Sequence, residues 1–226
     1  MLKKIVFMGT SVFAVKILKS LYQNGYPIAT VYTQAPKKSN RGMRVTKSPV
    51  HSISETLSLE VRTPVTLKNN QEEYEYLKDI DADMCLVIAY GQIIPESFLN
   101  LTKKGFINIH ASLLPKYRGA APIQRAIMNL EKKTGISIMK INSQLDEGPV
   151  CKSYEIDINE KDSSDDLSEK LSDLAVEKIL DDIDDILDDK AKFRDQDHSK
   201  ATMQKKLIKK RVVLIGTHQQ RVLSQK

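Results

Sequence analysis

Short apolar runs alternate with helical patterns over residues 1–190, and this alternation limits the possible folds more than any other feature. The runs are continuous and of strand length, as in parallel strands that are buried on both faces. Between them, apolar residues recur at helical spacing, for example over residues 12–24, with Ser11 as a candidate N-cap. We therefore predict an α/β fold, with a mostly parallel twisted sheet, helices on both faces and right-handed crossovers. The four runs are Ile5–Met8, Ile28–Thr33, Met84–Tyr90 and Phe106–His110.

Several other segments have a clear local pattern. We predict helices over residues 50–57 and 72–77, a further strand over residues 134–141, and a polar, basic loop over residues 37–47. Residues 162–190 are strongly acidic, and their apolar residues predict one amphipathic helix with a buried stripe and a solvated acidic face. The stripe consists of Leu167, Leu171, Leu174, Ile179, Ile183 and Ile186.

Composition excludes several classes of protein. The chain has 226 residues, of which 41% are hydrophobic and 28% charged, which excludes collagens and disulfide scaffolds and allows one to two domains. The apolar run at residues 84–89 is too short to span a bilayer. Cys85 and Cys151 are isolated, so no zinc or redox spacing is present, and Cys85 is expected in the core. We expect a cytoplasmic protein with no membrane attachment.

Positive charge is concentrated at the end of the sequence. Residues 203–226 contain seven lysines and arginines and no acidic residue, whereas the whole chain has a net charge of +6. The residues before them therefore carry a net charge of −1, so the basic balance belongs to this tail alone.

Among the four histidines, His110 has the most suggestive position. It ends a predicted strand, and ligands of open α/β sheets bind beyond the carboxyl ends of strands. Asn108 lies two residues earlier, so both side chains point to the same face. An imidazole beside an amide donor suits acyl transfer, because one group handles the proton and both can bind an oxyanion. By itself, a hydrogen-bonded histidine at a strand end is the simpler interpretation.

Two later loops add polar groups. Asp146 lies in a turn after a predicted strand, where its carboxylate could orient an imidazole and raise its pKa, although a plain turn residue before Gly148 is the commoner case. A second loop, residues 113–124, leads into a predicted helix.

Taken together, these motifs resemble the 10-formyltetrahydrofolate-dependent formyltransferases, and most specifically the members that formylate initiator methionyl-tRNA. The resemblance covers about residues 1–202, with the motifs in the right order, and implies a Rossmann-like formyltransferase fold. The matching segments are Gly9–Ala14, Tyr32–Gln34, Arg41–Gly42, Ser48–Val50, Ala89–Gly91, Asn108–Pro115, Arg118–Gln124 and Leu145–Gly148.

The resemblance implies roles for particular residues. Asn108, His110 and Asp146 match the catalytic trio: Asn108 would bind the oxyanion, His110 would assist the intermediate and the N10 leaving group, and Asp146 would hold His110. Folate would be bound by Ser112, Leu113, Leu114 and Pro115, and by the backbone of Tyr90 and Gly91. The formyl donor would be 10-formyltetrahydrofolate, with no metal.

The basic loop over residues 37–47 resembles a loop that contacts the tRNA acceptor stem, and Arg41 matches its characteristic arginine. Cationic side chains there would contact phosphates, whereas a solvated surface loop is the alternative for the charges alone. The candidate tRNA-binding residues are Lys37, Lys38, Arg41, Arg44 and Lys47. We expect initiator methionyl-tRNA as the partner of a monomer.

The resemblance divides the chain into a catalytic domain over residues 1–190, the start of an interdomain linker over 191–202, and an atypical basic tail over 203–226. The family's C-terminal β-barrel domain is expected to be absent. The tail has two interpretations: an out-of-frame product, since a shifted frame turns residues 202–206 into the family-like Thr-Tyr-Ala-Lys-Lys, or a genuine tail that binds RNA.

Two other functions compete with tRNA formylation. Formyl transfer to glycinamide ribonucleotide would use the same core, although a small substrate needs no inserted basic loop. An inactive, truncated RNA-binding remnant is compatible with the missing domain, whereas the complete catalytic trio favours retained chemistry.

Overall fold

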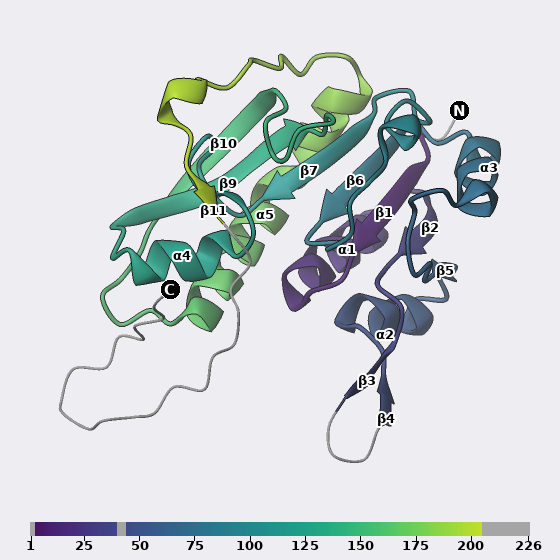
Figure 1. The fold of residues 1–226 in the computed structure, drawn as a ribbon, viewed down its shortest axis with the longest axis horizontal. Coiled ribbons are helices and arrows are strands. Elements are labelled where there is room, and N and C mark those ends of the chain that lie inside the picture. Colours follow the sequence, from purple (N-terminus) through teal and green to yellow (C-terminus); the bar gives the residue numbers. More distant parts are fainter. Residues whose placement is uncertain (1–2, 40–43, 205–226) are drawn as a thin grey trace.

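A central sheet of seven strands organises the computed structural model, which describes residues 3–39 and 44–204 (Figure 1). The sheet order is β10-β9-β7-β6-β1-β2-β5. Its strands are β1 (Ile5–Gly9), β2 (Ile28–Tyr32), β5 (Val61–Arg62), β6 (Met84–Ile88), β7 (Phe106–His110), β9 (Lys133–Lys140) and β10 (Val150–Asp157). The helices are α1 (Val12–Gln23), α2 (Pro49–Thr56), α3 (Gln71–Ile80), α4 (Pro122–Met128) and α5 (Ser164–Leu187), with short 3₁₀ helices at Glu96–Phe98 and His198–Lys200.

The strand directions confirm the predicted α/β class. Strand β1 runs parallel to β2 and β6, β6 runs parallel to β7, and β2 runs parallel to β5. Strand β9 is antiparallel to both β7 and β10, so the sheet is mostly parallel with an antiparallel edge. The carboxyl ends of β1, β6 and β7 lie side by side at one edge of the sheet, as their arrowheads show in Figure 1.

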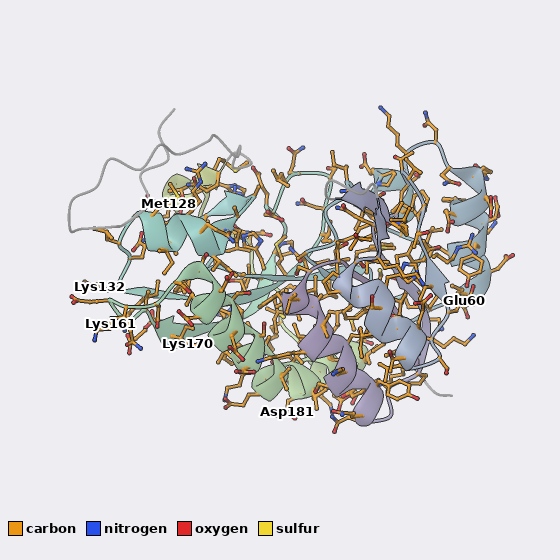
Figure 2. All side chains as sticks on the ribbon, turned by 90° about the horizontal axis from the view of Figure 1, so that it is seen from below. Glu60, Met128, Lys132, Lys161, Lys170 and Asp181 are labelled. Carbon is orange, nitrogen blue, oxygen red and sulfur yellow. The ribbon has the colours of Figure 1, made fainter. Side chains whose placement is uncertain are left out.

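Helices cover both faces of the sheet, as predicted. On one face, α1 and α5 pack against each other and against apolar side chains of the strands, and Figure 2 shows the two helices side by side. The other face packs against α3 and the first 3₁₀ helix, through Leu77 and Phe98. Cys85 is fully buried in this second core, as predicted, and burial raises the pKa of its thiol.

The acidic segment forms α5. Ser163 caps it, with its hydroxyl accepting from the Asp166 amide while the Asp166 carboxylate accepts from the Ser163 amide. The predicted apolar stripe faces the core, with Leu174 only half-buried. The predicted helix α1 also forms, but Ser11 occupies the N-cap position without a side-chain capping bond.

Besides strand β10, for which no strand was predicted, three features differ from the sequence predictions. The basic segment predicted as a loop forms an antiparallel pair, β3 (Lys37–Ser39) and β4 (Arg44–Thr46), because its backbone groups pair with each other. The apolar run ending at Tyr90 stops being a strand at Ile88, since Ala89 takes a positive φ of 47°. A small parallel pair, β8 (Arg118–Gly119) with β11 (Met203–Gln204), was not predicted, and residues 205–226 of the basic tail lie outside the described residues.

Candidate active site

Strand β7 delivers two of the candidate catalytic side chains to the carboxyl edge of the sheet. Ile107 and Ile109 point into the core with α1 and α5. Alternation along the strand therefore turns Asn108 and His110 to the opposite face, where Phe106 joins the second core. Asn108 is 9% exposed and His110 7% exposed, so both are largely shielded from water.

Each ring nitrogen of His110 faces an oxygen acceptor. The Nε2 atom lies 2.9 Å from the carbonyl oxygen of Tyr117, and the Nδ1 atom lies 3.7 Å from Asp146 Oδ2. The first distance is that of a hydrogen bond and the second is longer than one. The structure thus brings His110 and Asp146 together, but the Tyr117 carbonyl is what anchors the ring.

Asp146 is held by the loop that contains Tyr117. Its Oδ2 atom accepts a hydrogen bond of 2.8 Å from the Gly119 amide. The backbone of Asp146 has a φ of 52°, a conformation that aspartate tolerates better than bulkier residues. The carboxylate is thereby aimed at the imidazole from a turn.

The predicted folate segment, residues 112–115, follows β7 and is held in place by hydrogen bonds to neighbouring residues. Ser112 is fully buried, and its hydroxyl donates to the carbonyl of Lys116 at 2.6 Å. Ser137 Oγ donates to the Ser112 carbonyl at 2.8 Å and accepts from the Leu114 amide at 3.0 Å. The Ser112 hydroxyl thus serves the loop, whereas Leu113, Leu114 and Pro115 are half-buried and can line a ligand site.

Tyr90 and Gly91 lie where the chain leaves β6. The Tyr90 ring is buried in the second core, which raises the pKa of its hydroxyl, so its backbone is the part at the edge. Gln34 Nε2 donates to the carbonyls of Tyr90 and Gly91, at 3.1 and 3.0 Å. Gly91 has a φ of +79°, and a Cβ there would meet Gln34 Nε2 at 2.2 Å, so this turn requires glycine.

Three candidate tRNA-binding residues, Lys37, Lys38 and Arg44, lie on the β3–β4 pair, which projects from the body of the molecule beyond α2 (Figure 1), and Lys47 directly follows β4. Lys37 and Lys47 are exposed; Lys37 Nζ donates to Gln34 Oε1 at 2.6 Å, and Lys47 Nζ donates to Glu55 Oε1 at the same distance. Lys38 and Arg44 lie within the two strands, whereas Arg41 lies outside the described residues.

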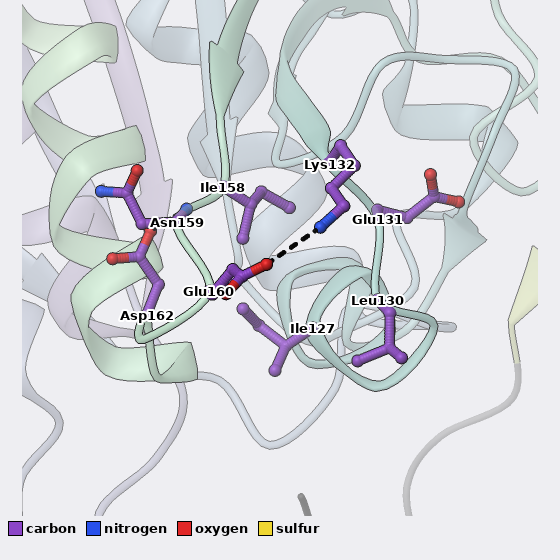
Figure 3. Close-up of a pocket in the computed structure, with 8 residues that line it drawn as sticks. All are labelled: Ile127, Leu130, Glu131, Lys132, Ile158, Asn159, Glu160 and Asp162. Carbon is purple, nitrogen blue, oxygen red and sulfur yellow. Dashed lines mark hydrogen bonds and ion pairs between the residues drawn. The ribbon is translucent and has the colours of Figure 1, made fainter.

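Of two hollows in the structure, one adjoins the candidate site residues and the other lies apart from them. The hollow in Figure 3 lies between α4, the end of β10 and the start of α5, and Lys132 Nζ approaches Glu160 Oε1 there at 3.6 Å. At about 20 Å³ it has room for about one water molecule. A groove of about 280 Å³ instead lies between Leu114 and Pro115, strand β10 and residues 194–197, so it adjoins the predicted folate segment.

Sequence reasoning missed the groups that support the site. The Tyr117 carbonyl has no sequence signal, because every residue has a carbonyl group. Gln196 contacts both loops of the site, although it lies in the segment predicted as a linker. Within residues 3–39 and 44–204, no cluster of three or more potential ligand side chains is arranged to hold a metal ion. No helix of these residues is both long and apolar enough to cross a bilayer.

Comparison with known proteins identifies the family of this chain. The family model described as formyl transferase matches residues 3–183. The methionyl-tRNA formyltransferase of Pelagibacter ubique (strain HTCC1062) is 60% identical over 209 residues, which are 92% of this chain and 67% of that protein. Across the first three such relatives, the chain spans from 53% to 67% of their lengths.

Solved structures share the fold at lower identity. An N-formyltransferase from Helicobacter canadensis, in complex with folinic acid and dTDP-3-aminofucose, is 22% identical with a TM-score of 0.67, over 90% of this chain and 71% of that one. Phosphoribosylglycinamide formyltransferase from Bacillus halodurans is 21% identical with a TM-score of 0.65, over 78% of this chain and 91% of that one. The curated relatives described above are named methionyl-tRNA formyltransferases, and the chain itself belongs to the formyl transferase family.

Proposed function

We propose that this chain supplies the formyl-transferring part of a methionyl-tRNA formyltransferase. It would move a formyl group from 10-formyltetrahydrofolate to the amino group of initiator methionyl-tRNA, as a cytoplasmic monomer. The observation that carries the proposal is the placement of His110 between the Tyr117 carbonyl and the Asp146 carboxylate, in a chain 60% identical to an enzyme of that name.

The proposed reaction begins when the methionyl amine attacks the formyl carbon. A C–N bond forms, the carbonyl oxygen gains negative charge, and Asn108 donates a side-chain hydrogen bond to this oxyanion. Collapse of the intermediate breaks the bond to N10 of the folate, which needs a proton. A donor aimed at a developing oxyanion is typically worth ~2.7–4 kcal/mol, so Asn108 has a large share of the rate.

His110 is the proposed proton source for N10. A ring protonated on both nitrogens donates from Nε2 to the Tyr117 carbonyl, and its Nδ1 proton, 3.7 Å from Asp146 and so not held in a hydrogen bond, is the one that would pass to N10. The Asp146 carboxylate lies on the Nδ1 side of the ring, and the Tyr117 carbonyl fixes the plane of the ring. The amine loses a proton as the new bond forms, so His110 can be recharged within one turnover.

The two substrates would approach different parts of the molecule. Leu113–Pro115, the Ser112 backbone and the backbone of Tyr90 and Gly91 would hold the folate at the carboxyl edge of the sheet. The cationic side chains of the β3–β4 hairpin would contact tRNA phosphates, which makes affinity depend on salt. Gln34 links the base of this hairpin to Tyr90 and Gly91 through the hydrogen bonds described above.

The direct test uses the full 226-residue chain with 10-formyltetrahydrofolate and charged initiator tRNA over a wide range of tRNA concentrations. We expect formyl-methionyl-tRNA to accumulate. Glycinamide ribonucleotide and charged elongator tRNA serve as alternative acceptors. Faster transfer to glycinamide ribonucleotide would replace the proposed acceptor, and no transfer by a folded, folate-binding sample would overturn the proposal.

A further inference from the structure

Gln196 lies buried between the two loops that carry the candidate active site, with 8% of its surface exposed. Its Nε2 atom donates to the carbonyls of Asp146 and Gly148, at 2.9 and 2.8 Å. Its Oε1 atom accepts from Nε and Nη2 of Arg118, at 3.0 and 2.9 Å. Both N–H groups and both lone pairs of the amide are therefore used, which is the full capacity of this side chain.

The hydrogen bonds of Gln196 to these two loops are called the bracket below. Arg118 makes this bracket rigid. It is 2% exposed, and a buried guanidinium is costly unless its donors are satisfied. Besides Gln196, it contacts Glu147 Oε1 at 3.2 Å and His198 Nδ1 at 3.3 Å. Arg118 thus ties its own loop to the neighbour of Asp146 and to the segment that contains Gln196.

The segment that contains Gln196 also forms hydrogen bonds, through Thr202, to the loop whose Tyr117 carbonyl anchors His110. Thr202 Oγ1 accepts from the Tyr117 amide at 2.7 Å, and the Thr202 carbonyl accepts from the Arg118 amide at 2.9 Å. Strand β11 then pairs with β8, so closely that a Cβ on Gly119 would meet the Gln204 carbonyl at 2.5 Å. Gln196, His198 and residues 202–204 therefore contact the loops that position the imidazole and the carboxylate.

We propose that Gln196 is a positioning residue, which acts through the backbone of Asp146 to set the separation between its carboxylate and the His110 ring. This inference rests on the proposed function. It assigns part of the active-site geometry to a segment that lies after α5. A displacement of about 1 Å in such a group can cost about 10²-fold in rate, so loss of this bracket should slow the chemical step.

The simpler alternative is that Gln196 only satisfies the buried Arg118 and contributes to stability. Gln196→Glu separates the two roles. A glutamate retains an oxygen acceptor for Arg118 but loses both donors, and it places an acceptor against the carbonyls of Asp146 and Gly148. Ser199→Ala, an exposed substitution three residues later, is the control.

We expect Gln196→Glu to lower kcat about 10- to 100-fold, with the KM for initiator tRNA changed less than twofold. Ser199→Ala should keep the wild-type kcat. In an Asp146→Asn background, Gln196→Glu should cost little further rate, because both substitutions then affect one group. Wild-type turnover of Gln196→Glu, or losses that multiply in the double variant, would overturn the inference.

A second measurement keeps the inference separate from the proposed function. The Gly119 amide donates to Asp146 Oδ2, so its hydrogen exchange reports on the placement of this carboxylate. We expect at least tenfold faster exchange at Gly119 in Gln196→Glu and unchanged exchange in Ser199→Ala. Inactive wild-type protein would defeat the proposed function alone, whereas unchanged Gly119 exchange would defeat the role of Gln196.

If Gln196→Glu does not fold, Arg118→Lys weakens the same bracket from its other end. Lysine keeps the positive charge but cannot present two donors to one amide oxygen. It should reproduce the loss of kcat and the faster Gly119 exchange. A folded Arg118→Lys protein with wild-type values of both would overturn the inference.

Discussion

Two arginines, Arg62 and Arg118, sit in buried or half-buried networks, but their partners differ in kind. Arg62 Nε and Nη2 donate to the two carboxylate oxygens of Glu73, at 2.7 and 2.8 Å. The Tyr32 hydroxyl also donates to Glu73 Oε2, at 2.6 Å. The guanidinium also lies over the Tyr76 ring, 3.9 Å from its centroid. Arg118 instead directs Nε and Nη2 together at the neutral amide of Gln196, and Glu147 adds a single carboxylate contact at 3.2 Å.

The difference separates stability from positioning. The Arg62 network joins β2, β5 and α3, which are regular elements at the sheet edge away from His110. A bidentate charged pair there holds elements that already have backbone ladders. The Arg118 network joins loops, and its amide passes the constraint on to two backbone carbonyls. The bidentate Arg62–Glu73 pair therefore strengthens the packing of helices and strands, whereas the neutral amide of Gln196 fixes the geometry of the loops.

The largest expected effect comes from a residue that belongs to neither network. Asn108→Ala should lower kcat about 10²- to 10³-fold, because it removes the proposed oxyanion donor. The KM for tRNA and the midpoint of urea unfolding should change little. Steady-state kinetics with Asn100→Ala, an exposed control, will check this. A loss confined to the KM for tRNA would remove Asn108 from the chemical step.

Glu73→Gln tests the stabilising network. Removing its charge leaves Arg62 without its buried carboxylate partner, so we expect the free energy of unfolding to fall by about 2–4 kcal/mol. The kcat of the folded protein should stay at the wild-type value. The matched control, Glu72→Gln, removes an exposed contact to Arg62 and should cost under about 1 kcal/mol by urea denaturation. A lowered kcat in folded Glu73→Gln would erase the distinction between the two networks.

Lys47→Ala tests a charge on the hairpin, outside both networks. If Lys47 contacts one phosphate, the slope of log affinity for tRNA against log salt should lose about 0.9 units in magnitude. Stability should change by under about 1 kcal/mol, because the Lys47–Glu55 pair is exposed. Lys68→Ala, also exposed, is the control. Equal salt slopes for Lys47→Ala and the wild type would rule out this contact.

The smallest expected effect concerns Asp182 on α5. Burial raises its pKa, although the Tyr154 hydroxyl donates to both of its carboxylate oxygens and opposes the shift. The folded state therefore holds this proton to higher pH than the unfolded state, so stability falls as pH rises from about 4 through the raised pKa. Asp182→Asn should remove this fall. Urea unfolding across that pH range measures the free energy of unfolding at each pH. The wild type and the exposed control Asp165→Asn should both show the fall, and Asp182→Asn should not.

The sequence was sufficient for the regular parts of the fold. Continuous apolar runs located β1, β2, β6 and β7, because short apolar runs bounded by turn residues are typical of parallel strands buried on both faces. Helical spacing located α1 and α5. The alternation of Tyr154 and Ile156 with charged residues is a signal for the edge strand β10 that the prediction did not use.

The site was predictable in part. Strand periodicity alone puts Asn108 and His110 on one face, and the motifs of the family brought Asp146 to them. The parts that could not be predicted depend on long-range contacts between ordinary groups, such as the Tyr117 carbonyl and Gln196. Gln196 lies 50 positions from Asp146, and no local pattern distinguishes a glutamine that brackets two loops from one on the surface.

The late position of Gln196 and Thr202 in the chain also has a consequence for synthesis. All strands of the central sheet and α5 lie before residue 188, so the ribosome can release a folded sheet while this segment is still in the exit tunnel. The loops around His110 and Asp146 then lack their bracket. A nascent chain would acquire its shape first and its competence for catalysis only when residues 196–204 emerge and dock.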